Sequence, residues 1–156
     1  KQIKIKIDNQ TTSKVLSEKL SKIGAENILE CLSLTENGEA KFIKQNASKA
    51  TYAKKINKKE SKINWEDSAK NILSKINGLN PSPGAWFEYG GLRYKVWKAV
   101  ISDQSGKAGE IIDEKFTIAC KEKSLRIIEI QKEGKNKMLT KDFLLGIKIS
   151  LGDKVS

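Results

Sequence analysis

The stretch that decides the fold is residues 80–101, NPSPGAWFEYGGLRYKVWKAVI. Its two prolines restrict their own φ angles and end any helix that precedes them. The Pro83-Gly84 pair then turns the chain, and Gly90-Gly91 is typical of the turn that joins two neighbouring strands. This stretch therefore predicts that a helical half of the chain changes here into a β half.

The residues after this turn are predicted to form a small β structure. Alternation with the two-residue period of a strand places Leu92, Tyr94 and Val96 on one face and Arg93, Lys95 and Trp97 on the other. Further short strands are predicted at 109–113, 116–120, 125–131 and 147–155, with a short helix capped by Thr140 before the last one. Five or six short strands with an interposed helix predict a small closed barrel of the oligonucleotide/oligosaccharide-binding (OB) type, a fold that does not by itself prove a function.

Upstream of the turn, the sequence predicts an isolated strand and three helices. Residues 3–7 alternate apolar and cationic side chains, a pattern typical of a strand with one buried face. Apolar residues at helical spacing predict a helix that ends or bends at Gly24 and a second helix that ends at Asn37, packed together as a pair. A third helix is predicted from Asn64 to Gly78. The predicted fold class is α+β, with a helical N-terminal segment and a linker followed by a small OB-like β-barrel.

Positive charge is concentrated in one part of the chain. The net charge is +11, and 28 of the 30 basic residues are lysines. Residues 41–63 hold eight lysines against Glu60 alone, a net charge of +7, with few large apolar residues between them. Such a segment is typical of an extended linker, and its charge favours contact with a polyanion through point charges. The alternative is a solvated connector that binds nothing.

The absence of histidine excludes several kinds of chemistry within this chain. With no His and only two isolated cysteines, Cys31 and Cys120, it cannot supply a typical zinc site or a His-based catalytic scheme. We expect both cysteines to be buried thiols in a reducing compartment. No apolar run approaches the length of a membrane-spanning helix and no secretory signal opens the chain, so we expect a soluble, intracellular protein with no metal and no membrane partner.

Collinear segments along the chain carry a family pattern. The segments are residues 19–25, 50–53, 63–65, 80–86, 94–99, 106–112 and 125–138. In this order they resemble the C-terminal part of the methionyl-tRNA formyltransferase family. The resemblance implies three regions: the tail of a catalytic domain at 1–46, a basic linker at 47–65, and a C-terminal OB-like tRNA-binding domain at 66–156.

The resemblance also implies a function and a partner. The family enzyme transfers a formyl group from 10-formyltetrahydrofolate to the methionine on initiator tRNA, in translation initiation, with catalytic Asn, His and Asp residues beside a Ser-Leu-Leu-Pro motif. That motif and the histidine are absent here. We therefore expect a monomeric fragment that binds initiator tRNA, holds no cofactor itself and is inactive alone. Its location would be the bacterial cytoplasm, or an organelle matrix in a eukaryote.

Basic side chains in three groups are the predicted tRNA contacts. They are Lys54, Lys55, Lys58, Lys59 and Lys62 in the linker, Lys132, Lys135 and Lys137 in a loop, and Arg93, Lys95 and Lys98 on the barrel face. For each of them the alternative is a solvated side chain. Trp86 and Trp97 could stack on bases, but in so small a barrel we expect them to fill the core.

Two other functions are compatible with the sequence. One is a stand-alone OB-type module that binds single strands or a protein, which would need aromatic residues among the charges, and the linker offers only Tyr52. The other is the C-terminal domain of another folate-dependent enzyme, a nucleotide-sugar formyltransferase or a formyltetrahydrofolate dehydrogenase. Such a domain should lack both the lysine-rich linker and the Glu133-Gly134-Lys135 loop, because its substrate is not a polynucleotide.

Overall fold

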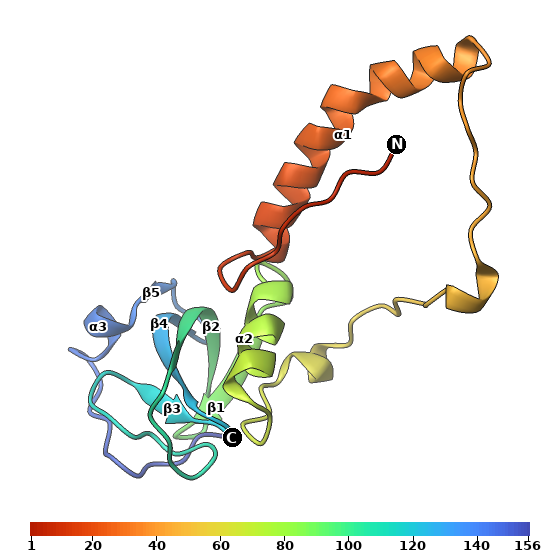
Figure 1. Ribbon diagram of the computed structural model, residues 1–156. Coiled ribbons are helices and arrows are strands. Elements are labelled where there is room, and N and C mark those ends of the chain that lie inside the picture. Colours follow the sequence, from red (N-terminus) through yellow and green to blue (C-terminus); the bar gives the residue numbers. More distant parts are fainter.

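The computed structural model describes residues 1–156, and it confirms the α+β class: a long helix and a linker are followed by an antiparallel sheet (Figure 1). The helices are α1 (Ser13–Glu36), α2 (Ala69–Gly78) and α3 (Thr140–Phe143), with short 3₁₀ helices η1 (Ala47–Lys49) and η2 (Lys58–Ser61) in the linker. The strands are β1 (Ala85–Tyr89), β2 (Leu92–Ser102), β3 (Thr117–Ala119), β4 (Ser124–Lys132) and β5 (Met138–Leu139).

The predicted hairpin forms the first two strands of the sheet. Gly90 and Gly91 adopt φ angles of +57° and +74°, which L-residues with side chains rarely adopt, and β1 pairs antiparallel with β2. The sheet continues in the order β1-β2-β4-β3, and β5 pairs with the other end of β4. Tyr94 and Val96 are buried while Arg93 lies on the opposite, exposed face, so the predicted alternation is confirmed for these residues, whereas Leu92 at the start of the strand is exposed.

The sheet does not close, and the prediction of a closed barrel is wrong. Its edge strands, β1 and β3, do not pair with each other. The segments predicted as strands at 109–113 and 147–155 form only isolated bridges, among them Glu110 with Lys154. Gly109 and Gly152, with φ angles of +79° and +87°, interrupt the extended backbone of these segments. Irregular chain therefore spans the gap between the two edges.

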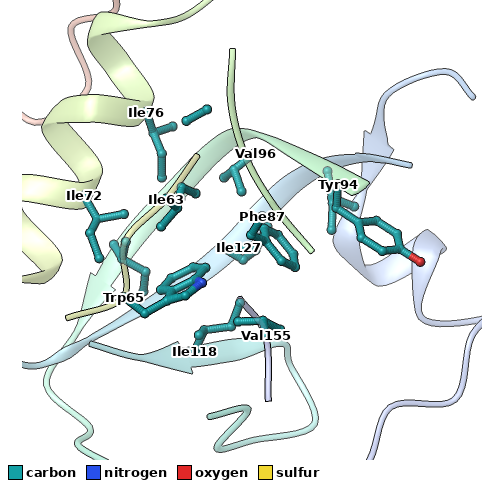
Figure 2. Close-up of a cluster of buried hydrophobic side chains, with 14 of the residues drawn as sticks. Ile63, Trp65, Ile72, Ile76, Phe87, Tyr94, Val96, Ile118, Ile127 and Val155 are labelled. Atoms are coloured by element: carbon teal, nitrogen blue, oxygen red, sulfur yellow. The ribbon is translucent and has the colours of Figure 1, made fainter. Parts of the chain in front are cut away.

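The hydrophobic core lies between α2 and the inner face of the sheet (Figure 2). Ile72 and Ile76 of α2 are buried against it, and the ring of Phe87 stacks on Tyr94 with a centroid distance of 5.7 Å. Trp65 packs edge-on against Phe87, and Ile63 is buried beside it. The last residues of the predicted linker thus belong to the core.

The helical prediction needs two corrections around this core. α2 begins after Ser68, whose Oγ accepts a hydrogen bond from the backbone N of Asn71, and not at Asn64. In α3 the N-cap residue is Leu139 and not Thr140, which is the first residue of the helix. The buried Oγ1 of Thr140 has no hydrogen-bond partner. Both helices otherwise lie where the sequence predicts them.

The N-terminal half differs most from the prediction. α1 is one continuous helix through Gly24, not a packed pair, and none of its residues is buried. Residues 3–7 are not a strand, since no other segment pairs with them. Figure 1 shows α1 projecting away from the sheet, with the linker returning in a wide loop. Its N-terminal end is attached by hydrogen bonds, among them one from Ser13 Oγ to the carbonyl oxygen of Asn80 at 2.6 Å.

Cys120 is buried as predicted, whereas Cys31 on α1 is only half-buried, and both thiols are free. No helix combines the length and hydropathy needed to cross a membrane. No group of three or more His, Cys, Asp or Glu side chains is placed to hold a metal ion.

Candidate nucleic-acid interface

The last turn of the basic linker is fixed against the edge of β1. Asn57 and Glu60 form a reciprocal capping box around η2, in which Asn57 Oδ1 accepts from the backbone N of Lys59 at 3.0 Å. Beyond η2, the backbone N of Ile63 donates to the carbonyl oxygen of Trp86 at 2.7 Å. Because these bonds hold the main chain, the lysines at 58, 59 and 62 are brought to the edge of the sheet.

The face of β1 and β2 that points away from the core presents two tryptophans among basic side chains. Trp86 pairs across the strands with Lys95, which in turn pairs with Gln131 of β4. The guanidinium carbon of Arg93 lies 3.9 Å from the ring centroid of Trp86, and the Nζ of Lys62 lies 5.4 Å from it. Cations at these distances are attracted to the indole ring.

Two adjoining hollows gather the cations of this surface. The first, of about 310 Å³, lies between η2 and the β1-β2 hairpin and is lined by Lys58, Lys59, Ser61, Pro83, Gly84, Trp86, Arg93 and Lys95. The second, of about 220 Å³, is lined by Arg93, Lys95, Gln131, Lys132, Glu133 and Gly134. Since Arg93 and Lys95 border both hollows, the two form one concave surface. We define the basic face as the five cations that line these hollows, Lys58, Lys59, Arg93, Lys95 and Lys132, together with Lys62, which lines neither hollow but lies over the ring of Trp86.

Positive charge on the basic face is nearly uncompensated. No acidic residue lines the first hollow, and Glu133 is the one acidic residue that lines the second. Five of the six cations form no ion pair; Lys62 is the exception, with its Nζ 2.9 Å from Glu88 Oε2. The arrangement can therefore attract a multiply charged anion.

The other five predicted contacts lie outside the basic face. Lys54 and Lys55 are exposed in the irregular linker. Lys98 borders a different hollow, of about 480 Å³, between β2 and the N-terminal turn. Lys135 and Lys137 follow β4 in the loop to β5, and the Nζ of Lys137 lies 3.5 Å from Glu129 Oε2. A role in binding stays a prediction for all eleven residues.

The expectation that both tryptophans fill the core is wrong. Trp86 and Trp97 are half-buried on the outer face, where each has a cation over its ring. Strand alternation contained a signal for this, because Trp97 falls on the same face as Arg93 and Lys95. Sequence reasoning also missed Glu88, the carboxylate that holds Lys62, since their pairing depends on where the linker docks.

A further hollow lies away from the basic face. It has a volume of about 570 Å³ and lies between β4 and α3, where Leu139, Thr140 and Leu144 form part of its lining. Arg126, Lys115 and Lys141 border it, and none of the predicted contact residues does.

Comparison with known proteins identifies the family. Residues 55–148 match the model of the formyl transferase C-terminal domain. The methionyl-tRNA formyltransferase of Pelagibacter ubique is 40% identical over 98% of this chain, and that of Carboxydothermus hydrogenoformans is 39% identical over 97%. The matches cover 50% and 51% of those proteins, so the chain spans about half the length of these relatives.

Solved structures share the fold. HypX from Aquifex aeolicus, in one variant, superposes with a TM-score of 0.66 at 22% identity, covering 94% of this chain and 28% of that one. Another HypX structure, a complex with tetrahydrofolic acid, covers 81% of this chain and 26% of its own with a TM-score of 0.58. At such identities the likeness concerns the fold alone. Taken with the family match over residues 55–148, the curated relatives show that this chain belongs to the formyl transferase C-terminal domain family and is homologous to the C-terminal half of methionyl-tRNA formyltransferase.

Proposed function

We propose that this chain is the tRNA-binding part of a methionyl-tRNA formyltransferase and that its basic face binds the phosphate backbone of initiator tRNA. The observation that supports this most is the gathering of linker and sheet cations on one concave surface, without acidic residues in its first hollow. Lysines suit the contact with phosphates because each acts as a mobile point charge. The alternatives, another folate-dependent enzyme or a stand-alone module, have less support because the relatives reported above are methionyl-tRNA formyltransferases.

The formyl transfer itself is proposed to take place outside this chain. The chain contains no histidine, and none of its residues is proposed to bind the donor, 10-formyltetrahydrofolate. The role left to these residues is to hold the body of the tRNA while another part of the protein acts on the methionyl group. Because the relatives are bacterial proteins, the bacterial cytoplasm is the proposed location.

The proposal predicts how steeply the affinity for tRNA falls with salt concentration. Each phosphate neutralised by a cation contributes roughly 0.7–0.9 to the slope of log K against log salt concentration, so six contacts give a slope of about −4 to −5. Affinity should then fall several hundredfold between about 50 mM and 200 mM salt. A binding mode dominated by apolar contact would show a far smaller slope.

Filter binding with initiator tRNA over a salt series tests the proposal. We expect the variant Lys95→Gln/Lys132→Gln to reduce the steepness of the slope by about 1.4–1.8. The matched control, Lys115→Gln/Lys141→Gln, removes the same charge from the hollow beside α3 and should leave the slope nearly unchanged. No binding by the wild-type chain at about 50 mM salt, or equal losses in the two variants, would overturn the assignment.

A further inference from the structure

Trp86 contacts two cations of the basic face, and its own main chain is fixed by two neighbouring segments. Its main chain is held on both sides, by pairing with Lys95 on β2 and by the hydrogen bond from Ile63 of the linker. Its ring lies 3.9 Å from the guanidinium of Arg93 and 5.4 Å from the Nζ of Lys62. One anchored ring therefore touches a cation from the sheet and a cation from the linker.

We propose that Trp86 holds Arg93 and Lys62 together as a clamp for the sugar–phosphate backbone, and does not itself stack on a base. The inference rests on the proposed function and specifies its ligand: neighbouring phosphates of a paired RNA strand. A guanidinium binds phosphate through a planar fork of donors, and stacking on the indole restricts the side chain to few orientations. Less conformational freedom is then lost when the phosphate binds.

Contacts on both rings support bracing in preference to base stacking. The guanidinium at 3.9 Å occupies one face of Trp86, so a base could stack on that face only by displacing it. The second tryptophan is arranged similarly, with the Nζ of Lys95 5.9 Å from the ring centroid of Trp97. The Nε1 of Trp97 donates to Gln131 Oε1 at 2.9 Å, so its polar edge is also engaged within the chain.

The position of Glu88 fits the same arrangement. Its carboxylate, 2.9 Å from the Nζ of Lys62, lies across the hairpin from Arg93. In the free protein the Glu88 carboxylate holds Lys62 near Trp86, and the Nζ of Lys62 lies over the indole ring. A phosphate that binds Arg93 can then reach Lys62 without a large movement of the linker.

A double-mutant cycle on tRNA affinity at about 100 mM salt separates bracing from stacking. We expect Trp86→Leu to weaken binding about tenfold, or 1.4 kcal/mol, and Trp86→Phe, which keeps an aromatic face, to weaken it less than about threefold. In the background of Arg93→Gln/Lys62→Gln, adding Trp86→Leu should cost less than about twofold, because no cations remain for the ring to hold. A base stacked on Trp86 would instead cost a factor of about five or more in both backgrounds.

Two further measurements keep the test decisive. Arg93→Lys preserves the charge but lacks the planar group, so it should also weaken binding severalfold, and it reports on the clamp even if Trp86→Leu fails to fold. A paired RNA hairpin should show the same cycle as tRNA, whereas an unpaired strand should bind less tightly. If the wild type binds but the effects of the Trp86 and cation substitutions are additive, the clamp is overturned and the proposed function stays intact. If the wild type does not bind, the proposed function itself is overturned.

Discussion

Gly84 connects the fold of the hairpin to the chemistry of its outer face. Its φ angle is +84°, and a Cβ placed on it would lie 3.2 Å from the Cδ of Lys95. Replacing it with alanine forces an L-residue into the left-handed region, which costs roughly 1–2 kcal/mol. The contact with Lys95 adds little to this, because the stem of a lysine can move by a few tenths of an ångström.

We therefore expect Gly84→Ala to lower the free energy of unfolding by about 1–2 kcal/mol. The melting temperature should fall by roughly 4–8 °C for each kcal/mol lost. Urea unfolding followed by tryptophan fluorescence measures this, since Trp65 is buried in the core. Because the stem of Lys95 needs to move by only a few tenths of an ångström, tRNA binding by the folded variant should stay close to that of the wild type.

Gly78→Ala is the matched control. Gly78 is the last residue of α2, has an ordinary helical φ, and has no atom within 4 Å of the position a Cβ would take. Alanine there should stabilise the protein by about 0.4–1 kcal/mol, because it reduces the freedom of the unfolded chain. If Gly84→Ala is as stable as the wild type, or if both variants lose the same stability, the backbone argument is refuted.

A carboxylate, two thiols and a phenol give three further expected outcomes. Glu88→Gln should raise tRNA affinity about two- to fivefold in filter binding, because removing a negative charge beside the bound phosphate outweighs losing the contact that positions Lys62; a loss of affinity would contradict this. In the native protein iodoacetamide should modify the half-buried Cys31 and not Cys120, which is 2% exposed and whose pKa burial raises to about 12; two adducts by mass spectrometry without urea would contradict it. Burial and the hydrogen bond to Asp153 raise the pKa of Tyr89 from 10.0 to about 12, so its stabilising effect is complete below pH 10 and is lost as the pH rises toward 12. The difference in free energy of unfolding between wild type and Tyr89→Phe, measured by urea unfolding, should therefore shrink from pH 10 to pH 12. A constant difference would contradict a stabilising effect of the raised pKa of Tyr89.

Local patterns in the sequence predicted the elements that depend on local interactions. The Gly90-Gly91 hairpin, the strand at 125–131 and the body of α2 all follow from turn chemistry and apolar periodicity. The isolated strand at 3–7 could not be decided in this way, because alternating side chains describe an exposed extended segment as well as a strand. A strand also needs a partner, and no pattern within five residues shows whether one exists.

Closure of the barrel could not be predicted from local sequence patterns, for a similar reason. It depends on whether chain segments far apart in sequence meet along their full length, and here residues 109–113 and 147–155 meet only at isolated bridges. Gly24 shows the opposite error. A single glycine costs only about 1 kcal/mol relative to alanine in a helix, which was too little to end α1.

The candidate site was predicted in composition but not in arrangement. Charge counting found the lysines, but which of them face Arg93 depends on main-chain bonds such as that between Ile63 and Trp86. Those bonds separate Lys58 from Lys55, three residues away in the same basic run. The outward position of Trp86 likewise follows from the register of β1, which the sequence leaves open.

Lysine footprinting tests the central claim most directly. The chain is treated with an amine-reactive acetylating ester, alone and saturated with initiator tRNA at low salt, and modification at each lysine is read by mass spectrometry. The basic face predicts protection of Lys58, Lys59 and Lys95 by the tRNA, with unchanged modification of Lys115 and Lys141. Uniform protection of all lysines, or protection confined to the hollow beside α3, would contradict the account.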